Sequence, residues 1–283
     1  MVKIAVIMTV HNRKQLTLRC LSNLFKQEQL GFSYLLDVFM TDDGSTDGTA
    51  AAVGRDFPSV HIVAGDGTLF WNRGMYASWQ KAVQNGNYDY FLWLNDDTYL
   101  YENAIMRLLD VANMYTSPCI VVGSTCASTD DSNITYGGYQ NGVLITDVDR
   151  IKPCDAINGN IVLISRQAFK VLGFNDPRFR HACGDTDYGL RAKSMGVTCV
   201  TGRGVFGICD LHECMTCWKD PGQPFIKRWK NFMSPLGNNP FEFFYFKRKH
   251  SGFVRASFTF VTNWIHFFFP RLWMKFKNNY DSK

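Results

Sequence analysis

Apolar runs and amphipathic segments alternate along the first two-thirds of the chain. The apolar runs have strand length and end in turn residues, as strands buried on both faces do. They lie at residues 3–10, 34–45, 60–65, 88–95, 119–125, 159–165 and 197–204. Apolar residues at helical spacing mark residues 13–27, 73–84, 102–114, 166–172 and 185–195. Strands that alternate with helices predict an α/β fold, with a Rossmann-like, mixed but mostly parallel sheet flanked by helices.

Two parts of the chain depart from this alternation. Residues 124–158 are polar and Gly-rich, and we expect loops and an irregular hairpin there, over one face of the sheet. Residues 219–283 hold 18 of the 42 aromatic residues and twelve Lys/Arg against three Asp/Glu, which gives 12 − 3 = +9. The net charge of +5 therefore leaves 5 − 9 = −4 for residues 1–218. We expect an α/β domain over 1–218 and an aromatic, basic, helical extension over 219–283.

The partner of this extension stays open between two interpretations. Its aromatic residues mix with Lys and Arg, and Arg255, Asn263 and His266 interrupt its longest apolar run, so it is a poor bilayer span. Helices of this composition are typical of peripheral attachment to a membrane surface. The alternative is packing against the α/β domain or a homodimer contact. A nucleic-acid partner is not expected, because it would leave the acid-rich strand ends described below without a purpose.

The nine cysteines are odd in number, scattered, and mostly within predicted strands. This distribution favours reduced, buried thiols over a disulfide framework. The opening MVKIAVIMTVHNR has a strand pattern without a basic n-region or a small-residue cleavage site, so we expect no signal peptide. We expect the protein in the cytoplasm. If the extension binds lipid, we expect it on the cytoplasmic face of the inner membrane.

Polar side chains follow the ends of several predicted strands, where open α/β sheets bind their ligands. Three of the four segments concerned are rich in acids; the four are TVHNR at 9–13, TDDGSTDGT at 41–49, LNDDT at 94–98 and GDTDYGLR at 184–191. Adjacent carboxylates at the end of a buried strand repel each other and lose hydration, so a cation should accompany them. Carboxylate oxygens suit Mg²⁺ or Mn²⁺, which would also let such a cleft accept a phosphate.

The segments VIMTVHNR, TDDGSTDGTA, LNDDT and GDTDYGLRAKSMG, in this order over about residues 1–215, resemble inverting family 2 glycosyltransferases with the GT-A fold. The resemblance is to the rhamnosyltransferase-like branch in particular. It implies a donor half over about 1–100 and an acceptor half over about 101–218. It also implies a nucleoside-diphosphate sugar as donor and Mg²⁺ or Mn²⁺ as cofactor.

The resemblance assigns the nucleotide of the donor to residues after the first two strands. Thr9 and Asp43 would hold the nucleobase and ribose, with Asn12 and Arg13 beside them, and Asp42 would assist or cap the turn. A turn followed by a helix N-cap at Asp47 or Thr46 explains the same TDDGSTDGT segment without a ligand. Both explanations hold together, because a cap shapes the loop.

The family's DxD signature corresponds here to Asn95, Asp96 and Asp97, with an amide in place of the first acid. Asp97 is then the expected metal ligand, and Asn95 and Asp96 face the donor. His212, in CDLHECMTC, stands where a histidine of the family completes the metal shell. Two alternatives remain for that segment: a zinc knuckle, although no second pair of cysteines lies at finger spacing, and a plain polar loop.

Asp185 corresponds to the acid that takes the proton from the acceptor hydroxyl, and Gly184 stands where the family usually has Glu. Asp187 and Arg191 are spaced as an i, i+4 ion pair at the start of a helix. Asn72 and Arg73 are candidates for the diphosphate of the donor. Trp71, beside them, would stack on the sugar or belong to the core.

Together these assignments predict a metal-dependent, inverting hexosyltransferase. It would move a sugar from dTDP-rhamnose or a UDP-sugar to a hydroxyl of a lipid-linked saccharide acceptor in bacterial surface polysaccharide assembly. Two alternatives remain: a non-catalytic scaffold of the same fold, and a sugar nucleotidyltransferase. The second would need a glycine-rich phosphate loop after the first strand, where TVHNRK has no glycine.

Overall fold

The structure, a computed structural model, describes residues 1–211, 217–237 and 239–271. The chain divides into two compact units, which are treated separately below. The sheet unit consists of Met1–Pro177 and Gly184–Leu211, and the helical unit consists of Arg178–Cys183 and His212–Lys283. This division falls earlier than the predicted boundary after residue 218. It also assigns a short internal segment to the helical unit, which the sequence did not indicate.

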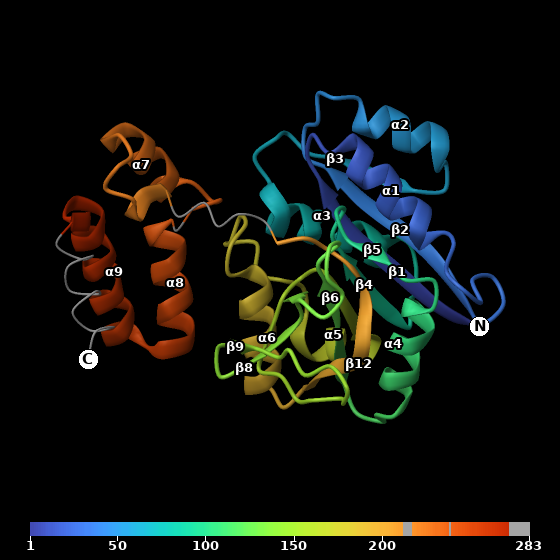
Figure 1. The fold of residues 1–283 in the computed structure, drawn as a ribbon. Coiled ribbons are helices and arrows are strands. Elements are labelled where there is room, and N and C mark those ends of the chain that lie inside the picture. The colour runs from blue at the N-terminus through green and yellow to red at the C-terminus, as the bar shows by residue number, and fades with distance from the viewer. Residues whose placement is uncertain (212–216, 238, 272–283) are drawn as a thin grey trace. The chain divides into compact units, whose positions relative to one another are not determined.

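The sheet unit is built on a mixed sheet with the strand order β3-β2-β1-β4-β11-β6-β12-β5, and β7 pairs with β6 (Figure 1). The strands are β1 (Val2–Val10), β2 (Tyr34–Asp42), β3 (His61–Ala64), β4 (Tyr90–Leu94), β5 (Tyr99–Leu100), β6 (Cys119–Cys126), β7 (Ile134–Tyr136), β11 (Ile161–Ser165) and β12 (Thr198–Ile208). β1 is parallel to β2 and β4, whereas β11 runs antiparallel between β4 and β6. The predicted α/β class, with its mixed sheet, is confirmed.

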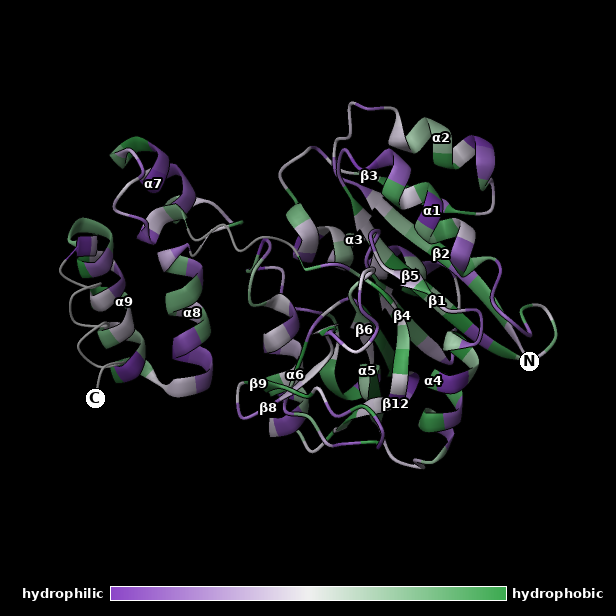
Figure 2. Cartoon of the chain, viewed as in Figure 1, coloured by the Kyte–Doolittle hydropathy of each residue, from purple (hydrophilic) through white to green (hydrophobic). Residues whose placement is uncertain are grey.

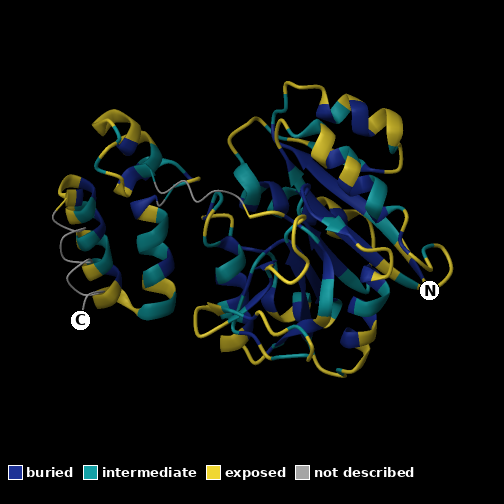
Figure 3. Cartoon of the chain, in the orientation of Figure 1, coloured by how far each residue is buried: buried dark blue, intermediate teal, exposed yellow. Residues whose placement is uncertain are grey.

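Helices cover both faces of this sheet, because alternate strand residues point to opposite sides. The helices are α1 (Lys14–Leu24), α2 (Thr49–Asp56), α3 (Phe70–Asn85), α4 (Ala104–Asn113), α5 (Arg166–Leu172) and α6 (Gly184–Ser194). Ile4, Val6 and Met8 of β1 belong to the core under α1, α2 and α4, and Ala5 and Ile7 to the core under α3, α5 and α6. The central strands are accordingly hydrophobic in Figure 2 and buried in Figure 3.

The strand directions decide where polar residues meet. The parallel strands β1, β2 and β4 end at one edge of the sheet, and the antiparallel β11 begins there, with Ile161 opposite Leu94. The turn before β11 therefore lies beside the turn after β4.

Residues 124–158, expected to form loops and a hairpin, contain the end of β6, β7 and a small second sheet. Its strands are β8 (Gly138–Gln140), β9 (Val143–Leu144) and β10 (Ala156–Ile157), in the order β10-β8-β9. β8 and β9 form an antiparallel hairpin. The strands β5, β7 and β10 are too short for the sequence pattern to reveal.

The helical unit contains a short 3₁₀ turn, η1 (Cys217–Lys219), followed by α7 (Phe225–Met233), α8 (Pro240–Ser251) and α9 (Phe253–Phe268). Trp218, Phe232 and Phe267 form its small core. The predicted helical character of the extension is confirmed. Within the described residues, no helix is long and apolar enough to cross a membrane.

The segment Arg178–Cys183 is held to α8 by an ion pair and by ring contacts within the helical unit. Arg180 Nε lies 2.5 Å from Glu242 Oε1, and the rings of Phe179 and Tyr245 lie 5.4 Å apart. These contacts are long-range in sequence, which explains why the chain pattern did not place this segment with the helices.

Candidate active site

The turn after β4 carries two nearly buried acids. Asp96 and Asp97 are only 4% and 8% exposed, and the Thr98 N–H donates to the carbonyl oxygen of Asn95 at 3.2 Å to close the turn. Burial raises the pKa of Asp96 to about 6; the neighbouring carboxylate of Asp97 adds to this rise, and Arg13 opposes it. The two acids therefore require a counter-charge, as their sequence suggested.

Arg13, between β1 and α1, supplies a counter-charge. Its Nη1 lies 3.0 Å from Asp96 Oδ1 and 2.5 Å from Asp97 Oδ2. Thr17, one turn along α1, donates its hydroxyl to Asp96 Oδ2 at 3.4 Å. Sequence reasoning placed Arg13 beside the donor nucleotide; the structure places its guanidinium on the acid pair. Two carboxylates thus share one guanidinium.

Two buried thiols flank the same turn. Cys20 donates to the carbonyl oxygen of Asn95 at 3.4 Å, and Cys209 donates to Asp97 Oδ1 at 3.7 Å. Burial, reinforced by the nearby acids, raises the pKa of the Cys20 thiol well above its usual value and that of Cys209 to about 12. Both thiols are therefore protonated donors at neutral pH. The eight described cysteines are free, as expected for this chain.

The amide of Asn95 is held by the protein at both ends. Trp71 Nε1 donates to Asn95 Oδ1 at 2.8 Å, and Asn95 Nδ2 donates to Asn160 Oδ1 at 3.1 Å. The amide that replaces the first acid of the DxD signature is thus matched by an indole N–H donor. The predicted contact of Asn95 with the donor sugar stays a prediction.

Asp43 lies at the end of β2, is 2% exposed and binds backbone N–H groups with both carboxylate oxygens. Oδ1 accepts from Gly67 at 2.9 Å and from Leu69 at 3.2 Å, and Oδ2 accepts from Phe70 at 2.7 Å. Phe70 has a left-handed backbone, with φ 56°, at the start of α3. Asp43 therefore stabilises the loop before α3, and its predicted contact with the nucleobase stays untested.

Asn12, just after β1, binds the TDDGSTDGT turn, and Asp42 closes that turn from within. Asn12 Oδ1 accepts from the Thr46 N–H at 2.7 Å, and Asp42 Oδ1 accepts from the Ser45 N–H at 2.9 Å. Asp47 accepts from the first N–H of α2, at Thr49, at 3.0 Å. The N-cap residue of α2 is Gly48, without a side-chain cap hydrogen bond, so the predicted cap at Asp47 or Thr46 is wrong; Asp47 binds the Thr49 N–H from the position before the cap.

Thr9 and Arg73 anchor the ends of α3's first turn. The Thr9 hydroxyl donates to the carbonyl oxygen of Trp71 at 3.3 Å, and Arg73 Nε donates to the carbonyl oxygen of Pro177 at 2.8 Å. Asn72, fully buried, donates to the carbonyl oxygen of Asp176 at 2.8 Å. Asn72 and Arg73 therefore brace the segment before α6. Contacts of these three residues with the donor stay predictions.

Asp185 lies in the first turn of α6, where its carboxylate accepts backbone N–H groups. Oδ2 accepts from Gly159 at 3.1 Å and Oδ1 from Thr186 at 2.7 Å. Burial raises the pKa of this carboxylate, and the N–H donors only partly offset that rise. Gly184 before it is required by packing, because a Cβ there would overlap the amide of Asn72.

Asp187 is fully buried and pairs with Arg191, whose Nε lies 3.0 Å from Asp187 Oδ2. Arg191 also donates to the carbonyl oxygens of Leu172 and Phe174. The predicted i, i+4 ion pair is confirmed, and Arg191 also connects α6 to the C-terminal end of α5.

The turn at residues 158–160 joins Asp185 to the acid-bearing turn, and sequence reasoning missed it. Gly159 donates to Asp185, and a Cβ on Gly159 would lie 2.3 Å from Trp71 Cζ2, so only glycine allows this approach. The Asn95 N–H donates to the carbonyl oxygen of Asn160 at 3.2 Å. The available signal was Asn-Gly-Asn directly before a buried strand.

His212 and Cys214 lie outside the described residues, so neither the metal-ligand nor the zinc-knuckle interpretation is tested. Among the residues that are described, no group of three or more His, Cys, Asp and Glu side chains is placed to hold a metal ion.

Comparisons with known proteins concern the family and the fold of this chain. The family model described as "Glycosyl transferase family 2" matches residues 5–172. No curated protein matches the chain. Among solved structures, the chain is similar to the mannosyltransferase PcManGT from Pyrobaculum calidifontis, solved in complex with GDP-Man and Mn²⁺. The identity is 15% over 96% of this chain and 83% of that one, with a TM-score of 0.55.

A second solved structure with a similar fold is S. aureus TarS. The identity is 11% over 89% of this chain and 44% of that chain, with a TM-score of 0.57. This chain therefore spans less than half of TarS. At such identities the two similarities concern the fold.

Proposed function

The chain belongs to glycosyl transferase family 2, and we propose that it is a metal-dependent, inverting enzyme with Asp185 as its general base. Membership of the family makes it a glycosyltransferase that takes its sugar from a nucleotide-sugar. The proposal concerns the stereochemistry, the metal, the residues and the substrates.

The observation that carries the proposal is the setting of Asp185. Its carboxylate is positioned by two N–H donors and has a raised pKa, which suits an acid that must accept a proton. Through Gly159 and Asn160 it is connected to the turn of Asp96 and Asp97. Transfer of a sugar to a hydroxyl requires a group that accepts the hydroxyl proton, which Asp185 would supply. It also requires a site for the diphosphate of the donor, which the pair of Asp96 and Asp97 would supply through a bound metal ion.

In the proposed reaction, the oxygen of the acceptor hydroxyl forms a bond to the anomeric carbon of the donor. The bond from that carbon to the diphosphate oxygen breaks, and its electron pair leaves with the nucleoside diphosphate. The proton of the hydroxyl passes to the Asp185 carboxylate. One displacement without a covalent enzyme intermediate inverts the anomeric carbon.

The acid pair fits a hard divalent cation. Two adjacent, nearly buried carboxylates both lie within ion-pair distance of the Arg13 guanidinium. Asp97, with Asp96 beside it, would hold Mg²⁺ or Mn²⁺. When bound, the ion neutralises charge that builds on the departing diphosphate. Arg13, displaced from the acids, would then be able to bind a phosphate oxygen.

The substrates follow from the resemblance to the rhamnosyltransferase-like branch. We expect dTDP-rhamnose or a UDP-sugar as donor, and a saccharide hydroxyl, on a lipid carrier, as acceptor in the assembly of a surface polysaccharide. PcManGT was solved with GDP-Man, so this donor belongs among the candidates.

The test is a donor panel followed by transfer assays. Thermal shift with dTDP-rhamnose, UDP-sugars and GDP-mannose, each with and without Mn²⁺, identifies the donor by a metal-dependent rise in Tm. With that donor, Asp185→Asn and Asp97→Ala should abolish transfer, while Asp56→Asn, an exposed acid paired with Arg55, should not. A retained configuration at the anomeric carbon, or full activity of Asp185→Asn, would refute the mechanism. A wild type inactive with every donor favours the scaffold.

A further inference from the structure

An exposed apolar stripe runs along α9. Its members recur at i, i+4, i+7, i+11 and i+14, which places them on one face of the helix. They are Val254 (80% exposed), Phe258 (72%), Val261 (55%), Ile265 (52%) and Phe268 (52%). Figure 3 shows exposed segments along this helix. Large side chains at these exposures leave an apolar surface in contact with water.

The opposite face of α9 serves the core of the helical unit. Ala256 and Phe267 are fully buried and Asn263 is 8% exposed. Phe267 stacks on Phe232 with ring centroids 4.9 Å apart. The stripe therefore lies on the face of α9 opposite to the buried residues of this helix.

The apolar surface continues from α9 onto α7. Trp229 of α7 lies with its ring 6.0 Å from that of Trp264, which stacks at 5.9 Å on Phe268 of the stripe. Phe225 and Ile226, in the first turn of α7, are 54% and 68% exposed. The exposed apolar residues thus extend across two helices rather than along one.

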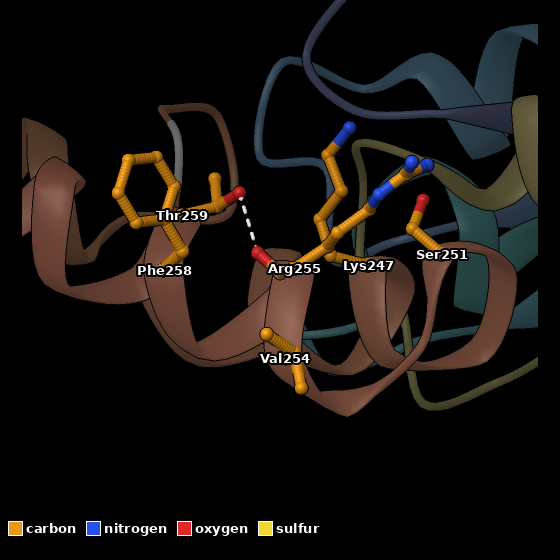
Figure 4. A pocket seen from close by; sticks show the side chains of 6 residues that line it. All are labelled: Lys247, Ser251, Val254, Arg255, Phe258 and Thr259. Carbon is orange, nitrogen blue, oxygen red and sulfur yellow. Dashed lines mark hydrogen bonds between the residues drawn. The ribbon is translucent and has the colours of Figure 1, made fainter.

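A basic hollow adjoins the stripe. It has a volume of about 410 Å³ and is lined by Lys247, Ser251, Val254, Arg255, Phe258 and Thr259 (Figure 4). Val254 and Phe258 belong to both the stripe and the hollow. Lys247 and Arg255 extend toward the same side as the Ser251 hydroxyl in this view. Two cations and a hydroxyl beside apolar side chains match a phosphate attached to an acyl chain.

The surrounding charge favours an anionic partner. Residues 217–237 and 239–271 contain nine Lys/Arg and two Asp/Glu, which gives 9 − 2 = +7. One of the two acids, Glu242, is paired with Arg180. A second copy of this chain would bring the same positive charge to the contact, so charge repulsion opposes a homodimer through this face.

We propose that the helical unit docks on an anionic phospholipid bilayer, with the stripe of α9 inserted at the level of the headgroups and Lys247 and Arg255 binding lipid phosphate. An amphipathic helix with cations at its border lies in the plane of the interface. Docking in that plane agrees with the lack of a bilayer-spanning helix among the described residues. The proposal does not depend on the sugar or metal assigned to the sheet unit.

The test measures sedimentation of the full-length protein with vesicles. Vesicles of phosphatidylcholine with 30 mol% phosphatidylglycerol should bind the protein at low salt, and pure phosphatidylcholine vesicles should bind it at least tenfold more weakly, since each Lys or Arg contributes about fivefold. Phe258→Glu and Ile265→Glu should each weaken binding at least tenfold. Lys247→Gln and Arg255→Gln should lower binding only to the anionic vesicles.

A matched control is Phe32→Glu, at an 84% exposed phenylalanine of the sheet unit. It should leave vesicle binding unchanged, and circular dichroism should show every variant folded. Equal binding to both vesicle types would overturn the proposal. So would a lack of vesicle binding together with a dimer, in analytical ultracentrifugation, that Phe258→Glu dissociates. Sugar transfer to a water-soluble acceptor is assayed without vesicles, so this proposal and the proposed reaction can fail separately.

Discussion

The two units of this chain use the same kinds of side chain in opposite ways. In the sheet unit, Trp79 and Trp93 are fully buried, and the ring of Trp79 contacts five other aromatic rings. In the helical unit, Phe258 and Phe268 remain more than half exposed. Aromatic content alone therefore does not indicate a core. Whether aromatic residues form a core depends on whether a sheet provides a face against which they can pack.

The two units also differ in how far their charged side chains are buried. The sheet unit buries two acids against one guanidinium at the end of a strand, and burial raises the pKa of Asp96 there and, separately, that of Asp185 in α6. Most of the basic residues that the structure describes in the helical unit are exposed to solvent, whereas Arg228 is only 7% exposed. Buried charged groups with shifted pKa values are typical of reactive sites, whereas exposed charges of one sign are typical of surfaces that bind a partner. The following five predictions test this contrast.

The largest effect is expected from Asp185→Asn in the sheet unit. An amide does not accept the proton of the acceptor hydroxyl, so kcat/KM should fall by about 10³-fold or more, within the range known for general bases. Asp185→Glu should retain part of the activity. The measurement is initial-rate transfer with the donor found by the panel. A loss of less than tenfold would remove Asp185 from its proposed role.

The titration of Asp185 should affect both the rate of transfer and the stability of the fold, and the two effects can be measured separately. Because the pKa of Asp185 is raised, wild-type kcat/KM should fall on the acidic side through a pKa above the usual aspartate value. Protonation then favours the folded state, so this contribution to stability is present at low pH and is lost as pH rises through the native pKa. The stability of Asp185→Asn relative to wild type should therefore improve with pH in that window. Urea unfolding at several pH values measures it.

Removal of one aromatic ring in each unit compares their packing directly. Trp79→Ala should cost about 3–5 kcal/mol of unfolding free energy, because it leaves a cavity in a close-packed core. Phe258→Ala should stay within about 0.5 kcal/mol, because its ring is 72% exposed. Urea unfolding followed by circular dichroism measures both. Equal losses would mean that the stripe of α9 is a packed surface after all.

Arg13→Gln examines the counter-charge of the acid pair. The guanidinium competes with a divalent ion for Asp96 and Asp97, so its removal should tighten Mn²⁺ binding roughly tenfold. This is near the lower end of what a hydrogen bond between charged groups contributes, because the Arg13 side chain is 38% exposed. Titration calorimetry with Mn²⁺ and no donor measures the effect, and Arg55→Gln serves as the control. Weaker binding by the Arg13 variant would argue against Asp97 as a metal ligand.

The sequence allowed the longer strands and the ion pair of Asp187 with Arg191 to be predicted, because these depend on neighbours in the chain. The antiparallel insertion of β11 was not predictable in this way, and it brings residues 158–160 beside Asn95. The hydrogen bonds from the N–H groups of Gly67, Leu69 and Phe70 to the Asp43 carboxylate depend on the path of the loop before α3, which the sequence pattern does not show. Both features depend on contacts between residues that are distant in sequence, which the local pattern of hydrophobic and polar residues does not reveal.

The smallest effect is expected at a helix cap of the helical unit. Asn239 Oδ1 accepts from the N–H groups of Phe241 and Glu242, and its Nδ2 donates to the carbonyl oxygen of Met233 at 2.8 Å. Asn239→Ala should cost about 1 kcal/mol, while Asn239→Ser should recover most of this, since serine keeps an acceptor at the N-cap. Hydrogen exchange should show about fivefold faster opening of α8 and unchanged opening of α3. Faster opening in α3 as well would mean that the two units unfold as one, and the contrast drawn here would then concern surfaces rather than separate folding units.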